Sequence, residues 1–389
     1  MTVVQLTTDN REPFRQYHKP RPWFGAAPAA LLEGFEQTPE VQVHVVSCTQ
    51  QPMPASPEKL APNIWFHSLH VPKLGWMRTG YQGCIRAARR KIREIAPALV
   101  HGQGTERDCA LSAVSSGRPN VVTIHGNMAE MARLFAARSF TYPWITGKLE
   151  NLTLPLTAGV FCNSRYTSAL VASRARRTWS VANPLRTAFF ADIPQHAREP
   201  LTIVNIGFVE PRKRQLEILE MAERLHRDGA GVQFEFIGQC LGATPYQRAF
   251  SARMVKAERA GFARWLPEQN PTSLIARLDR ASALLHFPVE EAFGLVVAEA
   301  LARNLKLFGA RVGGIGDIAD GIELAELHPA TDWEGLARGI RAWAEAGAPR
   351  PGAAADAMRE RYHPKVIAQQ HLEIYRTVLG EAGVTGGRA

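Results

Sequence analysis

The sequence lacks several features that would place it in a special class of protein. No run of eighteen apolar residues occurs, so the signature of a membrane-spanning helix is missing. No two of the five cysteines lie within twenty residues of each other, which gives neither a zinc-knuckle spacing nor a disulfide framework. The opening MTVVQLTTDNREPF has no basic flank before a long apolar stretch. We therefore expect no secretory signal and a cytoplasmic protein.

What is present is an ordinary globular composition with an uneven charge. The 389 residues are 46% hydrophobic and 21% charged, which is typical of a soluble chain of two or three domains. The formal net charge is +10, yet residues 1–190 hold 22 of the 46 Lys and Arg residues and only 11 of the 36 Asp and Glu residues. A basic half-chain favours nucleic acid, an anionic membrane surface or an acidic substrate, unless the charge only solubilises the protein.

Two series of short apolar runs, rich in β-branched residues, alternate with helix-like stretches. This pattern is typical of parallel sheets covered by helices on both faces. The first series comprises 3–8, 41–47, 98–103, 120–126 and 159–164, and the second comprises 201–207, 232–238, 282–288 and 306–310. Residues 183–200 contain three prolines and no clear period, which indicates a linker. We predict domains at 1–188 and 195–362, and a helix at about 364–379 that either completes the second domain or packs back on the first.

The strongest chemical signal is the segment PVEEAFGLVVAEA, which follows a predicted strand and opens a helix near Gly294. Ligands of open α/β sheets bind at this edge. The N–H groups of Leu295 and Val296 have no partner within the helix and, with its dipole, form an anion site suited to a phosphate. Glu299 follows about 7.5 Å along the axis, where a ribose would lie, and Glu291 precedes the helix. Two solvated glutamates flanking an amphipathic helix are the plainer alternative.

A second segment, GFVEPRKRQ, also follows a predicted strand and opens a helix. It brings together Arg212, Lys213 and Arg214. Cations near a helix N-terminus are unfavourable because that end is itself positive, so their presence favours an anionic ligand over a simple basic helix start. Converging cations suit a diphosphate leaving group, whose developing charge must be stabilised.

These motifs, in this order, resemble the GT-B glycosyltransferases, specifically the retaining enzymes of glycosyltransferase family 4. The run EAFGLVVAE resembles the family's motif of two glutamates separated by seven residues, and Lys213, six residues after Gly207, matches its phosphate-binding lysine. VTIHG, which ends at Gly126, resembles its first-domain histidine segment. The shorter runs CNSRYT, ANPL and RVGGIGD extend the similarity over about residues 95–378.

The resemblance implies a fold, a reaction and partners. The fold would be two Rossmann-like, doubly wound α/β domains facing a cleft, with the acceptor in the first domain and the nucleotide sugar in the second. The reaction would move a hexose from a nucleotide diphosphate sugar to an acceptor with retention of configuration. In that scheme the departing phosphate itself takes the acceptor proton, so no protein base is needed.

The resemblance also implies roles for particular residues. Glu299 would bind the ribose, and Glu291 would hold the sugar or orient its leaving phosphate. Lys213 and Arg212 would neutralise the diphosphate, assisted by the helix start at Gly294. His125 would hydrogen-bond the donor sugar, although a buried structural histidine is the plainer alternative.

Two positions depart from the family pattern. Phe208 stands where the family commonly has an arginine, and the glycine-rich loop after the first strand is matched best by Gly25. Phe208 motivates the alternative of a non-catalytic protein that binds a sugar nucleotide or a partner. No Asp-x-Asp pair occurs, so we expect cations and a helix end in place of a metal, and no other cofactor.

The basic first half contains two candidate surfaces. One is a helix with basic residues opposite its apolar ones, at Arg86, Arg89, Arg90, Lys91 and Arg93. It could contact phosphates, but no nucleic-acid-binding motif accompanies it, and we expect no nucleic acid. The other has aromatic residues between basic ones, at Phe135, Phe140, Tyr142 and Trp144, which suits a membrane interface unless the rings pack in the core. We expect reversible docking on the anionic inner face of a membrane, to reach a lipid-linked or otherwise anionic acceptor.

Overall fold

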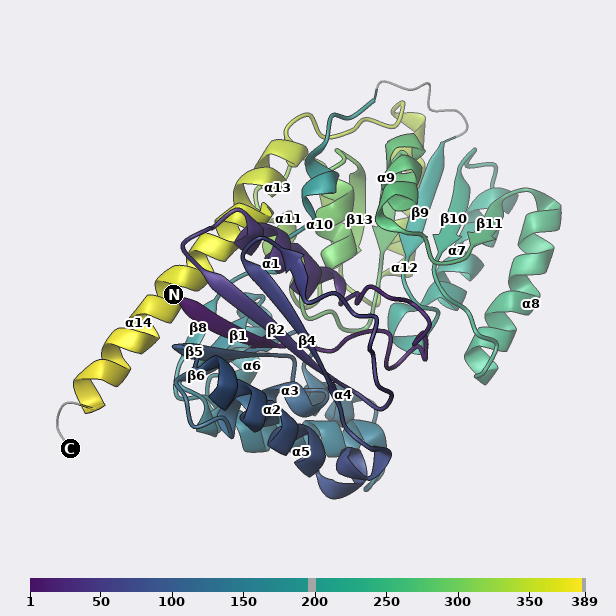
Figure 1. The fold of residues 1–389 in the computed structure, drawn as a ribbon. Coiled ribbons are helices and arrows are strands. Elements are labelled where there is room, and N and C mark those ends of the chain that lie inside the picture. Colours follow the sequence, from purple (N-terminus) through teal and green to yellow (C-terminus); the bar gives the residue numbers. More distant parts are fainter. Residues whose placement is uncertain (195–200, 387–389) are drawn as a thin grey trace. The chain divides into compact units, whose positions relative to one another are not determined.

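The computed structural model describes residues 1–194 and 201–386, which form two compact units (Figure 1). Unit 1 comprises Met1–Arg186 and Tyr362–Ala389, and unit 2 comprises Thr187–Arg361. Each is an α/β domain built on a sheet of mainly parallel strands, which confirms the predicted fold class. The last part of the predicted linker, residues 195–200, lies outside the described residues.

The sheet of unit 1 has the strand order β3-β4-β2-β1-β5-β6-β7-β8, and only the pairing of β3 with β4 is antiparallel. The order reverses between β1 and β5, and the carboxyl ends of these two neighbours form the edge where ligands of open α/β sheets bind. The strands are β1 (Thr2–Leu6), β2 (Gln42–Thr49), β3 (Lys59–Ala61), β4 (Ile64–His70), β5 (Leu99–Gln103), β6 (Asn120–Ile124), β7 (Val160–Cys162) and β8 (Thr178–Ser180).

Helices cover both faces of this sheet because successive strand residues point to opposite sides. Val3 and Leu99 pack in the core under α1 and α14, whereas Val4 and Val100 pack in the core under α2 and α3. The helices are α1 (Ala26–Glu36), α2 (Gln82–Ile95), α3 (Asp108–Val114), α4 (Met128–Leu134), α5 (Tyr142–Thr153), α6 (Arg165–Val171) and α14 (Pro364–Gly386).

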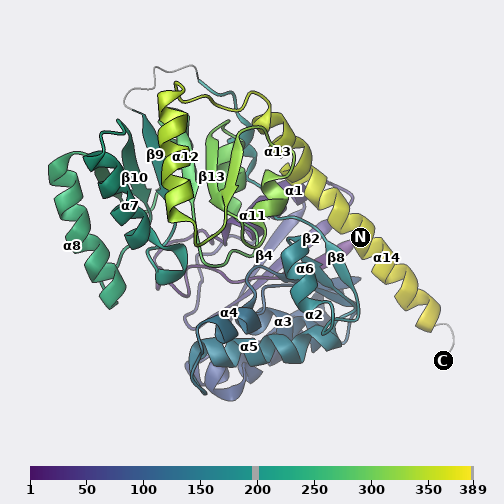
Figure 2. The same cartoon turned by 180° about the vertical axis from the view of Figure 1, so that it is seen from behind.

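The C-terminal helix α14 lies along α1 within unit 1 (Figures 1 and 2). Its residues Leu372 and Tyr375 join the buried core with Phe35 of α1. The helices approach so closely that a Cβ atom at Gly34 would lie 2.2 Å from the carbonyl oxygen of Pro364. Only glycine permits this contact.

The predicted basic helix is α2, and its pattern is confirmed. Its apolar side is buried at Cys84, Ile85, Ala88 and Ile92, whereas Arg86, Arg89, Arg90 and Arg93 are exposed. Lys91 is bonded to Glu94 one turn on. In the described part of the chain, no helix has both the length and the apolar character needed to cross a membrane.

The sheet of unit 2 is entirely parallel, with the order β11-β10-β9-β12-β13-β14. Here the order reverses between β9 and β12, so their carboxyl ends form the ligand-binding edge. The strands are β9 (Thr202–Ile206), β10 (Gln233–Ile237), β11 (Ala263–Leu266), β12 (Ala283–His286), β13 (Lys306–Ala310) and β14 (Ala325–His328). The helices are α7 (Gln215–Arg227), α8 (Pro245–Ala260), α9 (Pro271–Arg280), α10 (Leu295–Leu301), α11 (Ile315–Ala319), α12 (Trp333–Glu345) and α13 (Ala354–Tyr362).

The long basic and aromatic loop after β1 is held by a buried ion pair. The side chains of Arg11 and Asp9 are both fully buried and meet at 2.7 Å. Arg11 also donates to the carbonyl oxygens of Lys19 and Pro20 and to Ser56 Oγ. These bonds use both sides of the planar guanidinium group and fix the course of the loop between β1 and α1.

Candidate functional site

Four side chains meet where the strand order of unit 2 reverses, and we call them the unit 2 site. Arg212 and Lys213 follow β9, His286 is the last residue of β12, and Glu291 lies in the loop after it. Because β9 and β12 are neighbours, both loops leave the sheet at the same edge. Arg212, Lys213 and Glu291 were predicted from the sequence, and the structure brings them together.

Glu291 is the centre of the unit 2 site. Its Oε2 atom accepts from Lys213 Nζ at 2.5 Å and lies 3.0 Å from His286 Nε2. Arg212 Nη1 lies 3.8 Å from the same oxygen. Burial opposes ionisation of Glu291, but the charges of Lys213 and Arg212 and the His286 hydrogen bond outweigh it and hold the pKa of Glu291 well below its usual range. Glu291 is therefore a carboxylate throughout the physiological pH range.

His286 is neutral in this setting. Burial and the nearby charge of Lys213 lower its pKa to about 4. The neutral imidazole donates through Nε2 to Glu291 and so orients that carboxylate. Sequence reasoning missed His286, although its place at the strand end, five residues before Glu291, was a usable signal.

Arg212 ties the two loops of the unit 2 site together. Its Nη1 donates to the carbonyl oxygen of Glu290 at 2.9 Å, and its Nε and Nη2 donate to Glu210. The N–H of Val289 donates in turn to the carbonyl oxygen of Arg212. Both cations are thus already paired with carboxylates, and any anionic ligand would have to share or replace these partners.

Arg214 does not join the other two cations, so the expected group of three is wrong. Its backbone has φ +57°, in the left-handed region, and Nη1 donates to the carbonyl oxygen of Ala330 at 2.6 Å. Its guanidinium lies 5.8 Å from the ring centre of Trp333. Arg214 is therefore a packing residue at the start of α7.

The helix start after Glu291 has the predicted form. Gly294 precedes α10 with φ +101°, a conformation that favours glycine. Leu295 and Val296 are the first residues of α10, so no earlier carbonyl oxygen of the helix can accept a hydrogen bond from their N–H groups. The helix has only seven residues, so its dipole is short and most of the positive charge must come from Arg212 and Lys213. Glu299 lies in the second turn and is 7% exposed.

A glycine pair fixes the loop that carries Glu291. A Cβ atom at Gly313 would lie 1.8 Å from the carbonyl oxygen of Glu291, and one at Gly314 would lie 2.7 Å from that of Ala292. The N–H of Gly314 donates to the Glu291 carbonyl oxygen at 2.9 Å. Gly313 and Gly314, from the run RVGGIGD, therefore hold the Glu291 loop in place by close backbone packing.

The predicted unit 1 residues lie at the carboxyl edge of its own sheet. His125 directly follows β6, and its Nε2 lies 2.9 Å from Gln103 Oε1 at the end of β5. Burial lowers the pKa of His125 to about 4, so it is a neutral hydrogen-bonding group. Gly25 precedes α1, and Ala27 of that helix lines the same small cavity as His125. Gly25 has φ −52°, and a Cβ atom there would meet only Pro28, so the fold itself does not require glycine.

Glu106, in the loop after β5, is a second residue that sequence reasoning missed. A Cβ atom at Gly126, next to His125, would lie 3.9 Å from Glu106 Oε1. Burial and the nearby carboxylate of Glu150 raise the pKa of Glu106 to about 7. Among the described residues, no lysine or arginine forms an ion pair with it. A carboxyl group of this kind, at the edge where the strand order reverses, is suited to accept a hydroxyl hydrogen bond.

The raised pKa of Glu106 predicts a pH-dependent stability. The folded state binds the proton more tightly than the unfolded state, so the contribution of Glu106 is most favourable below its usual pKa of about 4.5 and declines until about 7. Glu106→Gln removes this cost and should raise the free energy of unfolding at about pH 8 by up to roughly 3 kcal/mol, which raises the melting temperature, with a much smaller effect near pH 5. Calorimetric melting of Glu106→Gln and Glu130→Gln at both pH values tests this. Equal shifts at the two pH values would contradict it.

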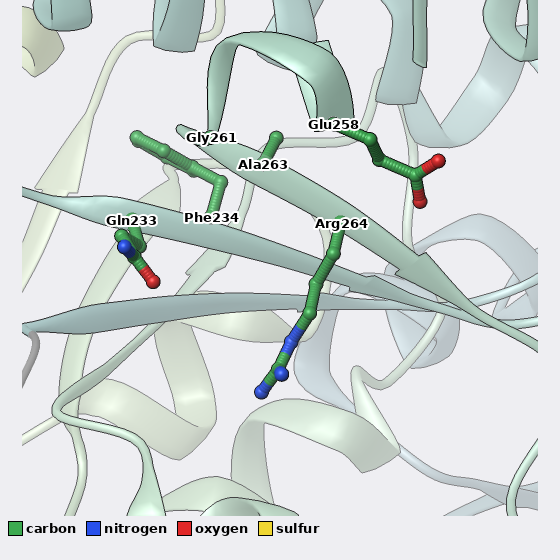
Figure 3. Close-up of a pocket in the computed structure, with 6 residues that line it drawn as sticks. All are labelled: Gln233, Phe234, Glu258, Gly261, Ala263 and Arg264. Atoms are coloured by element: carbon green, nitrogen blue, oxygen red, sulfur yellow. The ribbon is translucent and has the colours of Figure 1, made fainter. Parts of the chain in front are cut away.

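A hollow on unit 2 lies at the amino ends of the strands, opposite the carboxyl ends that carry the unit 2 site (Figure 3). It is lined by Gln233 and Phe234 at the start of β10, by Ala263 and Arg264 at the start of β11, and by Glu258 and Gly261 near the end of α8. These are the amino ends of the strands. The hollow is therefore distinct from the unit 2 site.

Comparison with known families assigns both units. Residues 29–184 match the family Glycosyltransferase Family 4, and residues 188–361 match Glycosyl transferases group 1. A comparison with curated proteins gave no match.

Solved structures share the fold at low sequence identity. Sucrose-phosphate synthase from Thermosynechococcus elongatus has a TM-score of 0.75 at 14% identity, over 98% of this chain and 100% of that one. Anabaena HepE in complex with UDP-glucose has a TM-score of 0.70 at 14% identity, over 97% and 100%. The apo form of the lipopolysaccharide outer core galactosyltransferase WaaB has a TM-score of 0.67 at 12% identity, over 97% and 100%. The two family matches and this shared fold show that the chain is a GT-B glycosyltransferase that resembles glycosyltransferase family 4.

Proposed function

We propose that this enzyme moves a hexose from a nucleotide diphosphate sugar to an acceptor, with retention of configuration and without a metal ion. One observation carries the proposal: Lys213 and Arg212 converge with Glu291 at the strand-order reversal of unit 2, beside the start of α10. HepE binds UDP-glucose, which makes UDP-glucose the first donor to test.

The residues of the unit 2 site and of the adjoining helix α10 each have a part in this reaction. Lys213, on a flexible stem, shifts from Glu291 toward the diphosphate and offsets the charge that develops on the leaving group. His286 keeps its hydrogen bond to Glu291, so the carboxylate stays oriented to accept a sugar hydroxyl. The Glu299 carboxylate accepts hydrogen bonds from the ribose hydroxyls, and the N–H groups of Leu295 and Val296 donate to phosphate oxygens. Arg212 keeps the two loops in register.

Proton transfer needs no protein base in this scheme. The departing phosphate accepts the proton of the attacking hydroxyl while Lys213 and Arg212 stabilise its charge. His125 of unit 1, neutral because its pKa is about 4, binds a sugar hydroxyl rather than acting as an acid. Gly25 leaves room for a ligand near the start of α1.

Metal independence rests on the chemistry of the unit 2 site. A divalent cation at a diphosphate is held by clustered carboxylates, and the sequence has no Asp-x-Asp pair. Glu291 is already paired with two cations. We expect turnover that does not depend on added Mg²⁺ or Mn²⁺.

Donor turnover and the configuration of the product test the proposal. The enzyme is incubated with UDP-glucose and other nucleotide diphosphate sugars, and release of the nucleoside diphosphate is followed with and without candidate acceptors. Proton NMR then gives the configuration of the new glycosidic bond. An α product from an α-linked donor supports retention, whereas a β product contradicts it.

We also propose that unit 1 docks on an anionic membrane through a surface that we call the aromatic patch. It comprises Leu134, Phe135, Phe140 and Tyr142, whose exposed fractions are 38%, 47%, 83% and 49%. The ring centres of Trp144 and Phe140 lie 5.3 Å apart, and Lys148 Nζ lies 5.5 Å from the ring centre of Trp144. Exposed rings among cations suit the headgroup region, and this supports a lipid-linked acceptor on the inner face of a membrane.

The aromatic patch predicts a defined loss of membrane binding. Phe135→Ser with Phe140→Ser should weaken binding to anionic vesicles at least about fivefold, because partial burial of the two rings is worth roughly 1–3 kcal/mol. Co-sedimentation at low and high salt measures this, with Leu241→Ser, which changes an exposed apolar residue of unit 2, as the control. If the wild-type protein does not co-sediment with anionic vesicles at low salt, membrane docking is refuted.

A further inference from the structure

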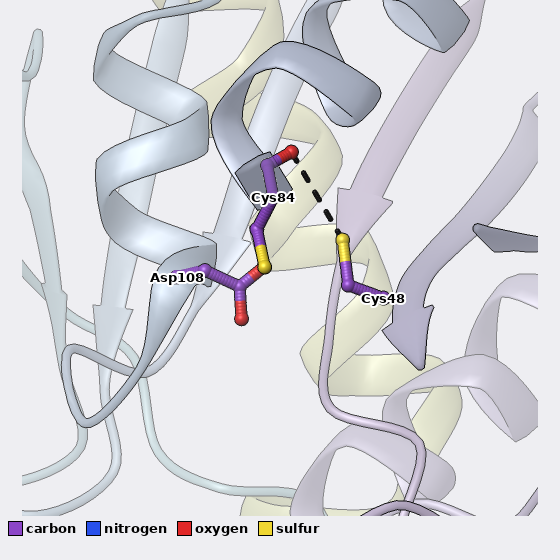
Figure 4. Close-up of side chains that lie close together, drawn as sticks. All are labelled: Cys48, Cys84 and Asp108. Carbon is purple, nitrogen blue, oxygen red and sulfur yellow. Dashed lines mark hydrogen bonds between the residues drawn. The ribbon is translucent and has the colours of Figure 1, made fainter. Parts of the chain in front are cut away.

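A cluster of ligating side chains lies in unit 1, apart from all residues assigned above (Figure 4). Cys48 is near the end of β2, Cys84 is in the first turn of α2, and Asp108 is the first residue of α3. One ligating atom from each lies within 4.8 Å of the others, and all three residues are buried. No spacing in the sequence reveals this cluster, because its members come from three separate elements.

We propose that Cys48, Cys84 and Asp108 bind a zinc-like divalent cation. Tetrahedral zinc, with bonds of about 2.3 Å to sulfur and 2.0–2.2 Å to oxygen, needs ligand atoms roughly 3.5–3.8 Å apart. The observed spread of up to 4.8 Å requires only a small contraction. Two sulfur ligands and one carboxylate oxygen suit Zn²⁺ better than Mg²⁺ or Ca²⁺, which prefer oxygen.

The surroundings of the cluster can balance the charge of a bound cation. Two thiolates and a carboxylate around a divalent cation leave one net negative charge, and Arg107, next to Asp108 in the chain, can balance it. Its guanidinium lies 4.9 Å from the ring centre of Trp76, which packs in the hydrophobic core beside Cys48 and Cys84.

Three protein ligands leave one coordination position for water or another donor. Cys48 and Asp108 are each 8% exposed, so the cluster lies just beneath the surface and an ion has a short path to it. The ion would join the carboxyl end of β2 to the starts of α2 and α3, at the ligand-binding edge of unit 1. This inference does not depend on the proposed reaction, which we assign to the unit 2 site without a metal.

Cobalt substitution tests the cation site directly. The full chain is stripped with a chelator, kept reduced with a phosphine, and titrated with Co²⁺, whose thiolate charge-transfer and visible bands report sulfur ligands. We expect one Co²⁺ per chain, displaced by Zn²⁺. Cys48→Ser and Cys84→Ser should each weaken binding at least 100-fold, whereas Cys109→Ser, which removes another buried thiol of unit 1, and Cys240→Ser should not.

Thiol protection covers the case in which a variant fails to fold. In the wild-type protein, Zn²⁺ should shield Cys48 and Cys84 from alkylation, as identified by peptide mass mapping, and leave the labelling of Cys240 unchanged. Absence of sulfur-based bands, or bands that persist in both Cys48→Ser and Cys84→Ser, would overturn the proposal. Because these readouts need no nucleotide sugar, their failure is separate from failure of the proposed reaction.

Discussion

Replacing Lys213 by alanine should lower turnover of the nucleotide sugar by about 10²–10³-fold, the effect of removing one preorganised group that stabilises developing negative charge. Folding should change little, because Glu291 keeps its hydrogen bond to His286 and its proximity to Arg212. Steady-state release of the nucleoside diphosphate and thermal melting of the same preparation separate the two effects.

Two further variants sharpen the Lys213 experiment. Lys256→Ala removes an exposed lysine of α8 in the same unit and should leave turnover unchanged. Arg214→Ala should also be mild, because Arg214 packs against Ala330 and Trp333. Wild-type turnover in Lys213→Ala would remove the leaving-group role from the unit 2 site.

Replacing Glu299 by alanine should weaken nucleotide binding by roughly 1–3 kcal/mol, the scale of lost hydrogen bonds to a charged group. The loss should be the same for the free nucleoside diphosphate and for the sugar donor, because the ribose is common to both. Isothermal calorimetry with both ligands measures it. Glu345→Ala, at the exposed end of α12, is the control.

The comparison of the two ligands identifies what Glu299 touches. A loss confined to the sugar donor would place Glu299 at the hexose, and unchanged affinity for both would remove the ribose role. Because Glu299 is buried, melting curves must accompany the titrations, and Glu299→Gln gives a variant of the same volume.

The central strands of both sheets could be predicted from the sequence because they are buried on two faces and read as apolar runs. All nine predicted strands are present, within a few residues of their expected ends. In the residues that the structure describes, five further strands were missed. Four of these are the edge strands β3, β8, β11 and β14, which are short and carry polar residues such as Arg264 and Glu326. The fifth, β4, mixes three polar residues into IWFHSLH and so lacks a continuous apolar run.

The part of the candidate site that could be predicted consists of residues that directly follow a predicted strand. Lys213 and Glu291 each follow a predicted strand, and the structure makes these strands neighbours and joins the two side chains. His286 lies near the end of a predicted strand, five residues before Glu291, so its place was readable although it was missed, whereas the surroundings of Glu106 depend on contacts between separate loops, which spacing does not encode. Arg214 was misplaced because a left-handed backbone turns its side chain toward Ala330, although it is next to Lys213 in sequence.

A thermal-shift panel of nucleotide diphosphate sugars, with their free nucleoside diphosphates, tests the central claim most directly. A ligand that binds only the folded state stabilises it by mass action, by about 2.7 kcal/mol at a hundred times its Kd. We predict that one nucleotide raises the melting temperature, both free and with its sugar, and that Glu299→Ala and Lys213→Ala reduce the shift while Lys256→Ala and Glu345→Ala keep it. A panel in which no nucleotide shifts the wild-type protein, or in which the shift is unchanged in both site variants, would contradict a donor site at the strand-order reversal of unit 2.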